Sequence, residues 1–193
     1  MKLVMIRHPV TLANIAGVIQ KDVKGDIAQR GYIQIEQVTS RLSSIRFDNC
    51  YSSDLDRCRE LSERLGTISE INPFYSPLFR EMSNGVLDGE KKDRVQRLEA
   101  DDPYNFKPEG GESINELVVR ARKGLKLILS RSGDKNLLVS HGWFLKVFLG
   151  NQLGMNPLDA IRKLKFSNCA LSEIDITKTN CLVEYLNNRD YLT

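Results

Sequence analysis

Histidine is rare in this chain, and each of its two histidines stands directly after an apolar run. His8 follows Arg7 at the end of the run in LVMIRHPVTLAN, and His141 ends the run in KNLLVSHGW. Arg57 lies in CYSSDLDRCRE, just past another apolar stretch, and Glu81 lies in LFREMSNG. Because short apolar runs with β-branched residues predict buried strands, these side chains are expected where strands end.

Two imidazoles, two guanidiniums and one carboxyl group suit the transfer of a phosphoryl group. Guanidinium forks bind phosphate oxygens in pairs and stay charged, an imidazole can attack phosphorus, and a carboxyl group can protonate the leaving oxygen. Unaided hydrolysis of phosphate monoesters is so slow that such a site must supply about 20 kcal/mol or more. Residue type alone leaves purely structural roles open. Most histidines are structural, and Glu81 could form an exposed ion pair with Arg80.

The elements that must position these groups alternate between strand and helix patterns. Apolar runs predict strands over residues 2–6, 47–53, 71–77, 136–141, 169–176 and 181–187. Helices are expected at 11–16 with Thr11 as cap, over 30–45, after a cap at Asp54, over 114–129 behind a capping box of Ser113 and Glu116, and over 142–154. This order predicts a three-layer α/β/α sandwich around a mostly parallel sheet, to which the C-terminal hairpin adds an antiparallel edge.

Ligands bind at the carboxyl ends of the strands in such a sheet, so His8 and His141 are expected in one crevice. Residues 85–111 form the most polar and irregular stretch, which indicates a lid inserted into a single domain that spans residues 1–193. The C-terminal hairpin also offers a sheet edge through which a homodimer could form.

Composition excludes several function classes. Hydrophobic residues make up 41% and charged residues 27% of the chain, and the net charge is only +3, which argues against nucleic-acid binding. The apolar runs are too short for a signal peptide or a membrane span. The four cysteines have no metal-ligand spacing and are expected to be free thiols in a reducing cytoplasm. No cofactor is expected.

Six segments, in order along the chain, resemble the motifs of the histidine phosphatase superfamily, the phosphoglycerate-mutase-like proteins. LVMIRHPVTLAN resembles the signature R-H-G-x-[ST]-x-x-N, and IAQRGYIQIEQV resembles L-T-x-x-G-x-x-Q-A. YSSDLDRCRE and FREMSNGVLDG resemble S-S-x-L-x-R-A-x-x-T and L-x-E-x-x-x-G-x-W-E-G. PEGGESINELVVR resembles the G-G-E-S segment ahead of a long helix, and LLVSHG the second histidine motif.

This resemblance implies a role for each candidate residue. His8 would be the residue that is transiently phosphorylated, and Glu81 would protonate the leaving group and later activate water. The residues implied in binding the phosphoryl group are Arg7, Arg57, His141, Asn14 and Thr11. The implied activity is a metal-independent phosphomonoesterase that acts through a phosphohistidine on His8.

Departures from the family pattern bear on the type of activity. Pro9 replaces the glycine of the signature, which removes an N–H and biases His8 toward an extended conformation. Leu61 and Leu87 replace a threonine and an aromatic residue that the family often has. Trp143 stands where the mutase branch carries asparagine, EMSNG lacks the basic residue of the mutases, and the chain is shorter than theirs. These last differences favour hydrolysis over a mutase reaction.

The substrate is expected to be a small phosphate ester, either a sugar phosphate or a nucleotide-like molecule such as α-ribazole phosphate. Trp143, Tyr104 and Phe106 could stack on an aromatic or ribosyl group, although Trp143 could equally belong to the core. Three other functions stay open at this point. They are a phosphoglycerate mutase that needs a phosphorylated cofactor, a weakly active regulatory protein that binds phosphate esters, and a metallohydrolase, which the arginines disfavour because they would repel a cation.

Overall fold

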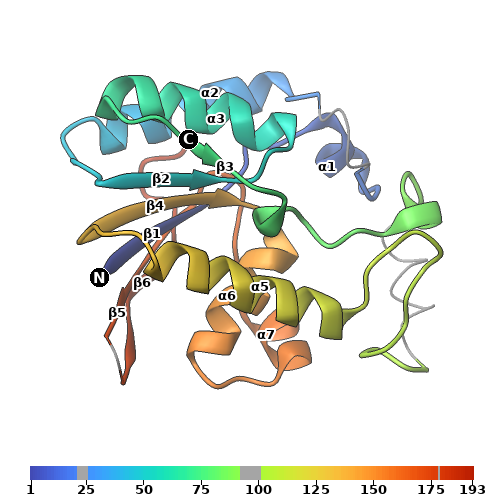
Figure 1. The fold of residues 1–193 in the computed structure, drawn as a ribbon. Coiled ribbons are helices and arrows are strands. Elements are labelled where there is room, and N and C mark those ends of the chain that lie inside the picture. Colours follow the sequence, from blue (N-terminus) through green and yellow to red (C-terminus); the bar gives the residue numbers. More distant parts are fainter. Residues whose placement is uncertain (21–25, 92–100, 178) are drawn as a thin grey trace.

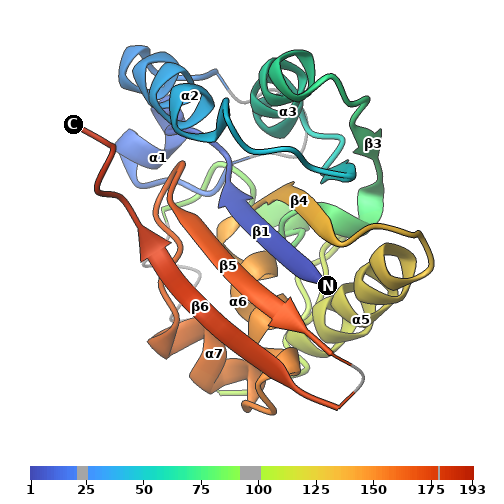
Figure 2. The ribbon, with the colours of Figure 1, turned by 90° about the vertical axis from the view of Figure 1, so that its left-hand side faces the viewer.

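A six-stranded sheet forms the centre of the computed structural model, which describes residues 1–20, 26–91, 101–177 and 179–193 (Figure 1). The strands are β1 (Lys2–Arg7), β2 (Asn49–Ser52), β3 (Phe74–Tyr75), β4 (Lys135–Ser140), β5 (Leu171–Ile176) and β6 (Cys181–Asn188). Their order is β3-β2-β4-β1-β5-β6, and the pairs among β1 to β4 are parallel, whereas β5 and β6 run antiparallel. The predicted mostly parallel sheet with an antiparallel hairpin edge is therefore confirmed (Figure 2).

Helices cover both faces of this sheet. They are α1 (Leu12–Ala16), α2 (Gln29–Leu42), α3 (Asp56–Ser69), α5 (Ile114–Leu129), α6 (Gly142–Gln152) and α7 (Pro157–Lys163), together with the 3₁₀ turns η1 (Pro77–Phe79) and η2 (Gly85–Leu87). Figure 1 shows α2 and α3 over one face and α5, α6 and α7 over the other. This is the expected α/β/α sandwich.

The apolar sequence of β1 is explained by its place in the middle of the sheet. Leu3 and Met5 belong to the core under α5 and α6, whereas Val4 and Ile6 belong to the core under α2 and α3. All four side chains are fully buried. A strand that is covered on both faces needs a continuous apolar run. Its parallel neighbour β4, and β2 on the far side of β4, end at the same edge of the sheet as β1.

Two of the predicted helix starts are confirmed and one is wrong. Thr11 caps α1, and Ser113 and Glu116 form the capping box of α5. Asp54 does not cap α3, which begins after Leu55 without a side-chain cap. Its carboxylate accepts two hydrogen bonds from Arg80, at 2.6 and 2.7 Å. A bidentate guanidinium pair is stronger than a bond to one backbone amide, and it holds the pKa of Asp54 below its usual value.

Gly31 lets α2 approach the loop that follows His8. A Cβ atom at this position would lie 2.4 Å from the carbonyl oxygen of Val10 and 2.6 Å from Cγ2 of Ile27. The glycine in the IAQRGYIQ segment is therefore explained by a close backbone approach.

The expected lid is only partly within the described residues, because residues 92–100 lie outside them. Its two ends meet in a bridge between Asn84 and Gly111. The role of residues 85–111 as a lid thus stays a proposal.

Further expectations concern the cysteines, membranes and the sheet edge. All four cysteines are free, as expected. In the described ranges no helix combines the length and the apolar character that crossing a bilayer requires. Strand β6 forms one edge of the sheet and exposes Leu182 and Leu186, and pairing of two copies there remains a prediction that sedimentation velocity would test.

Candidate active site

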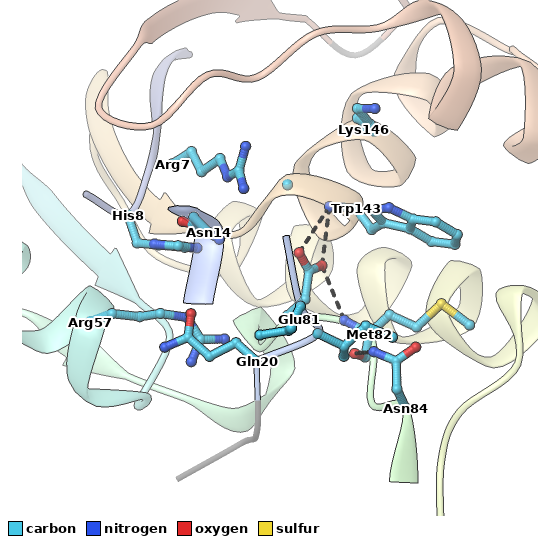
Figure 3. A pocket seen from close by; sticks show the side chains of 13 residues that line it. Arg7, His8, Asn14, Gln20, Arg57, Glu81, Met82, Asn84, Trp143 and Lys146 are labelled. Atoms are coloured by element: carbon cyan, nitrogen blue, oxygen red, sulfur yellow. Dashed lines mark hydrogen bonds between the residues drawn. The ribbon is translucent and has the colours of Figure 1, made fainter. Parts of the chain in front are cut away.

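A pocket of about 270 Å³ opens at the carboxyl ends of β1 and β4 (Figure 3). Its walls are made by Arg7, His8, Asn14, Val18, Ile19, Gln20, Arg57, Glu81, Met82, Asn84, Gly142, Trp143 and Lys146. Figure 3 shows His8 and Arg57 on one side of the view and Glu81 and Trp143 on the other. Residues far apart in the sequence thus meet at the edge where the parallel strands end.

His8 is almost fully buried and its ring is held in one orientation. Its backbone N–H continues the β1–β4 ladder to Ser140, and its carbonyl accepts a bond from the amide of Asn168. The ring atom Nδ1 lies 2.8 Å from the carbonyl oxygen of Pro9. Since a carbonyl oxygen can only accept, Nδ1 carries a proton, and in the neutral ring the lone pair then lies on Nε2. The imidazole is therefore in the tautomer that a nucleophile needs.

Arg7 and Arg57 bring two guanidinium groups to the pocket. Nη1 of Arg7 donates to the carbonyl of Phe166. Within the described part of the chain, Nε of Arg7 and both Nε and Nη1 of Arg57 are buried and have no hydrogen-bond partner. Burial lowers the pKa of Arg7, an effect that Glu81 opposes and Arg57 reinforces. Buried N–H donors of two adjacent cations form a site for an anion that has several oxygens.

His141 lies beside His8, with 5.1 Å between the ring centroids, and is fully buried. Its Nε2 atom lies 2.9 Å from the hydroxyl of Ser53 and 3.4 Å from the thiol of Cys58. Its Nδ1 atom has no partner among the described residues. Burial, followed by the nearby charge of Arg57, lowers the pKa of His141 well below its ordinary value, so this ring is neutral near pH 7. His141 is not among the residues that line the described pocket, so its part in binding a phosphoryl group stays a proposal.

Glu81 is fixed at the N-terminus of α6. Its carboxylate accepts hydrogen bonds from the backbone N–H groups of Trp143 and Met82, both at 3.1 Å (Figure 3). It also accepts one from the N–H of Phe144 at 3.0 Å. The first N–H groups of a helix have no partner within the helix and attract a negative charge. The alternative that Glu81 merely pairs with Arg80 is wrong, because the guanidinium of Arg80 binds Asp54 instead.

The first residue of α6 lies between the cation and the carboxylate. A Cβ atom at Gly142 would lie 3.4 Å from Cζ of Arg7 and 3.6 Å from Oε2 of Glu81. Both side chains therefore lie close to the start of the helix, and both line the same pocket.

Asn14 and Trp143 line the pocket, but Thr11 does not. Thr11 is buried beneath it, where its hydroxyl caps α1 and donates to the side chain of Gln20. Trp143 is also packed against the core under α5 and α6. Both interpretations of this tryptophan, as pocket wall and as core, therefore apply.

Tyr104 and Phe106, which were expected to stack on a substrate, do not line the described pocket. The hydroxyl of Tyr104 donates to Asn156, at the N-terminus of α7, over 2.8 Å, and its ring packs against the core. The side-chain amide of Asn115, in α5, donates to Oδ1 of Asn105. These contacts hold the segment against α5 and α7 instead of over the pocket.

Three polar residues of the pocket were not predicted from the sequence: Gln20, Asn84 and Lys146. Lys146 follows Trp143 by three residues, so helical spacing could have placed it on the same face. Its ammonium group donates to the carbonyl of Ile161 in α7 over 2.6 Å. Burial, with the charge of Arg7, lowers its pKa. No local pattern distinguishes Gln20 or Asn84, which reach the pocket through loops.

Known proteins with similar sequences belong to one family. The family model of the histidine phosphatase superfamily (branch 1) matches residues 3–189. A relative from Erwinia tasmaniensis, named "Probable phosphoglycerate mutase GpmB", is 31% identical over 179 residues, which are 89% of this chain and 83% of that protein. A protein of the same name from Yersinia pestis is 32% identical over 181 residues, with the same shares covered.

Solved structures with the same fold include phosphatases. The alpha-ribazole phosphatase from Shigella flexneri has a TM-score of 0.89 and 21% identity, with 97% of this chain and 96% of that one covered. A phosphoserine phosphatase mutant from Entamoeba histolytica, in complex with phosphoserine, has a TM-score of 0.85 and 21% identity, with 100% and 99% covered. The fold agrees with the family match, which spans almost the whole chain, and the protein therefore belongs to the histidine phosphatase superfamily.

Proposed function

We propose that this protein is a metal-independent phosphomonoesterase that hydrolyses a small phosphorylated metabolite through a phosphohistidine on His8. The observation that carries the proposal is the orientation of His8, whose Nδ1 proton is held by the carbonyl of Pro9, so that in the neutral ring the lone pair is on Nε2. The unpaired buried N–H donors of Arg7 and Arg57 support it further, because both residues line the pocket and these donors can bind the oxygens of a phosphoryl group.

In this proposal the reaction has two steps. Nε2 of His8 forms a bond to phosphorus while the ester P–O bond breaks, and Glu81 gives a proton to the leaving oxygen. A water molecule then attacks the phosphohistidine, its proton passes to Glu81, and the P–N bond breaks to release inorganic phosphate. The guanidiniums of Arg7 and Arg57 stabilise the charge on the transferring group in both steps, and neutral His141 supplies a further hydrogen bond.

The leaving group would lie in the pocket against the wall that Trp143 and α6 form. The pocket is also lined by the apolar side chains of Val18, Ile19 and Met82 and by polar Gln20, Asn84 and Lys146. Such a mixture suits a small ester with both apolar surface and hydrogen-bonding groups. Sugar phosphates and nucleotide-like phosphates are the proposed substrates, and one structural relative is a phosphatase for α-ribazole phosphate. The four free thiols support a cytoplasmic location.

The names of the curated relatives favour a second candidate, a phosphoglycerate mutase. A mutase must keep the phosphoryl group on histidine until a second hydroxyl accepts it, whereas a phosphatase lets water in. Incubation with 3-phosphoglycerate separates the two. Release of inorganic phosphate without 2-phosphoglycerate supports hydrolysis, and interconversion that depends on a phosphorylated primer supports the mutase.

The central test is hydrolysis of para-nitrophenyl phosphate in EDTA by the wild type and by His8→Ala. We expect turnover by the wild type alone, and an acid-labile phosphoryl group on the wild type after rapid quenching. Thermal unfolding of His8→Ala controls for the fold. Equal turnover by both proteins would overturn the role of His8, and loss of wild-type activity in EDTA would overturn metal independence.

The proton-donor role of Glu81 has its own test. Glu81→Gln keeps two hydrogen-bonding atoms but cannot donate a carboxyl proton. We expect about 10²-fold or greater loss for alkyl phosphates, whose leaving groups need a proton, and a much smaller loss for nitrophenyl phosphates. Equal slowing of both ester types would exclude this role.

A further inference from the structure

Arg120, on α5, uses every N–H group of its guanidinium, although it does not line the described pocket. Nε and Nη2 donate to the two carboxylate oxygens of Glu112, at 2.8 and 2.6 Å. Nη1 donates to the carbonyls of Leu78 and Arg80, at 3.1 and 2.7 Å, and Nη2 also donates to the carbonyl of Glu81 at 3.1 Å. A guanidinium has five N–H donors in a rigid plane, and here they make five hydrogen bonds.

Three of these bonds end on the backbone that leads into Glu81. The carbonyls of Leu78 and Arg80 lie in and just after η1, a single 3₁₀ turn, where carbonyl groups lack partners within the turn. The chain beyond Glu81 is held from the same side, because the N–H of Glu112 donates to the carbonyl of Ser83 over 2.8 Å. Arg120 and Glu112 therefore secure the backbone before and after the carboxylate.

Arg120 also contacts the other support of that carboxylate. Its Cζ atom lies 5.5 Å from the ring centroid of Phe144, whose backbone N–H is one of the donors to Glu81. The pair is mostly shielded from solvent, with 18% of the Arg120 side chain and 14% of the Glu112 side chain exposed. The guanidinium thus spans the backbone of Glu81 and the helix start to which its side chain is bonded.

We propose that Arg120, oriented by Glu112, is a positioning residue that holds the carboxylate of Glu81 where it can protonate the leaving group. This inference rests on the proposed function of Glu81. Glu81 reaches the pocket from a loop, and a loop side chain keeps a fixed place only if its backbone is fixed. Displacement of a reacting group by about 1 Å can cost 10²-fold in rate.

The test compares Arg120→Met and Arg120→Lys with the wild type on a series of phosphate monoesters, from dinitrophenyl to alkyl esters. We expect Arg120→Met to lower kcat about tenfold or more for alkyl esters and less than about threefold for the dinitrophenyl ester. Lysine keeps the charge but has only three N–H donors, so Arg120→Lys should restore part of the rate. A uniform loss across the series would overturn the proposal.

Two controls separate positioning from general destabilisation. Ser113→Ala removes the cap of the same helix and should lower the melting temperature without changing how the rate depends on the leaving group. Glu112→Gln serves if Arg120→Met does not fold, because it leaves the guanidinium in place and removes only the carboxylate that orients it. Glu112→Gln should again lower the rate mainly for alkyl esters. An equal loss of rate for all esters would contradict the proposal.

The double variant Arg120→Met, Glu81→Gln distinguishes this inference from the function on which it rests. Without the carboxylate, the loss of Arg120 should cause no further selective slowing of alkyl esters. If the rate loss of the double variant is instead the product of the losses of the two single variants, Arg120 acts independently of Glu81. If Glu81→Gln itself shows no leaving-group selectivity, the proposed role of Glu81 has failed; if it does and Arg120→Met does not, only the positioning role has failed.

Discussion

The Nδ1 atom of His8 bonds to the carbonyl oxygen of Pro9, the residue that replaces the glycine of the family signature. The contact uses the carbonyl of residue 9, and proline lacks only the N–H. Pro9→Gly should therefore change kcat/KM by less than about threefold, while it lowers stability by up to about 1 kcal/mol because glycine increases the entropy of the unfolded chain. Steady-state kinetics and thermal unfolding measure the two effects. An activity gain above tenfold would show that proline impairs the nucleophile.

His141 should make the stability of the protein depend on pH. Its pKa is lowered in the folded state, so the unfolded state binds more protons as the pH falls below about 6.5. The stabilisation is therefore present above that pH and is lost on acidification, with a slope of at most about 1.4 kcal/mol per pH unit for one proton. His141→Gln should reduce this slope in denaturant unfolding between pH 7 and 5.5. His8 is present in both proteins and does not cause a difference between them. Equal slopes of unfolding free energy against pH would therefore contradict the burial effect assigned to His141.

Gly31→Ala should destabilise the protein by about 1–3 kcal/mol, because the new Cβ atom overlaps the carbonyl oxygen of Val10. That carbonyl belongs to the loop that follows His8, so kcat should fall as well. Ser40→Ala, at an exposed position of the same helix, is the control and should change stability by less than about 0.5 kcal/mol. Similar melting temperatures for the two variants would refute the close approach.

Trp143→Ala should weaken the binding of esters with an aromatic leaving group. An aromatic contact is worth about 0.5–1.5 kcal/mol, which corresponds to a rise in KM of roughly 2- to 10-fold. Trp143→Phe should keep most of the affinity. Competitive inhibition by inorganic phosphate is the control, since phosphate occupies only the part of the pocket beside the arginines. Weakened inhibition by phosphate would instead indicate damage to the whole site through the core contacts of the indole.

The part of the site that lies at strand ends could be predicted from the sequence. Arg7 and His8 directly follow a run whose apolar continuity places it in the centre of a parallel sheet, and the same logic places His141. Neither conclusion needs knowledge of a distant contact, since the topology alone brings the two ends together.

Features that depend on a choice between partners could not be predicted. Asp54 has the sequence position of a helix cap, and only the tertiary structure brings Arg80 close enough to compete for it. Arg120 looks like any polar residue of an amphipathic helix, because its partners are backbone carbonyls some 40 residues earlier in the chain. Tyr104 resembles a substrate-stacking residue, and its contact with Asn156 has no local signal.

The central place of β1 also has a consequence for how the protein is made. Its partners β4 and β5 are translated long after it: the ribosome adds about 5–20 residues per second, and about 130 residues separate β1 from β4, so the delay is on the order of 10 s. During this time the run that carries Arg7 and His8 has no neighbouring strand, and an unpaired apolar strand is prone to associate with other chains. The strand that supplies the proposed nucleophile is thus also a segment of the nascent chain that needs protection from aggregation.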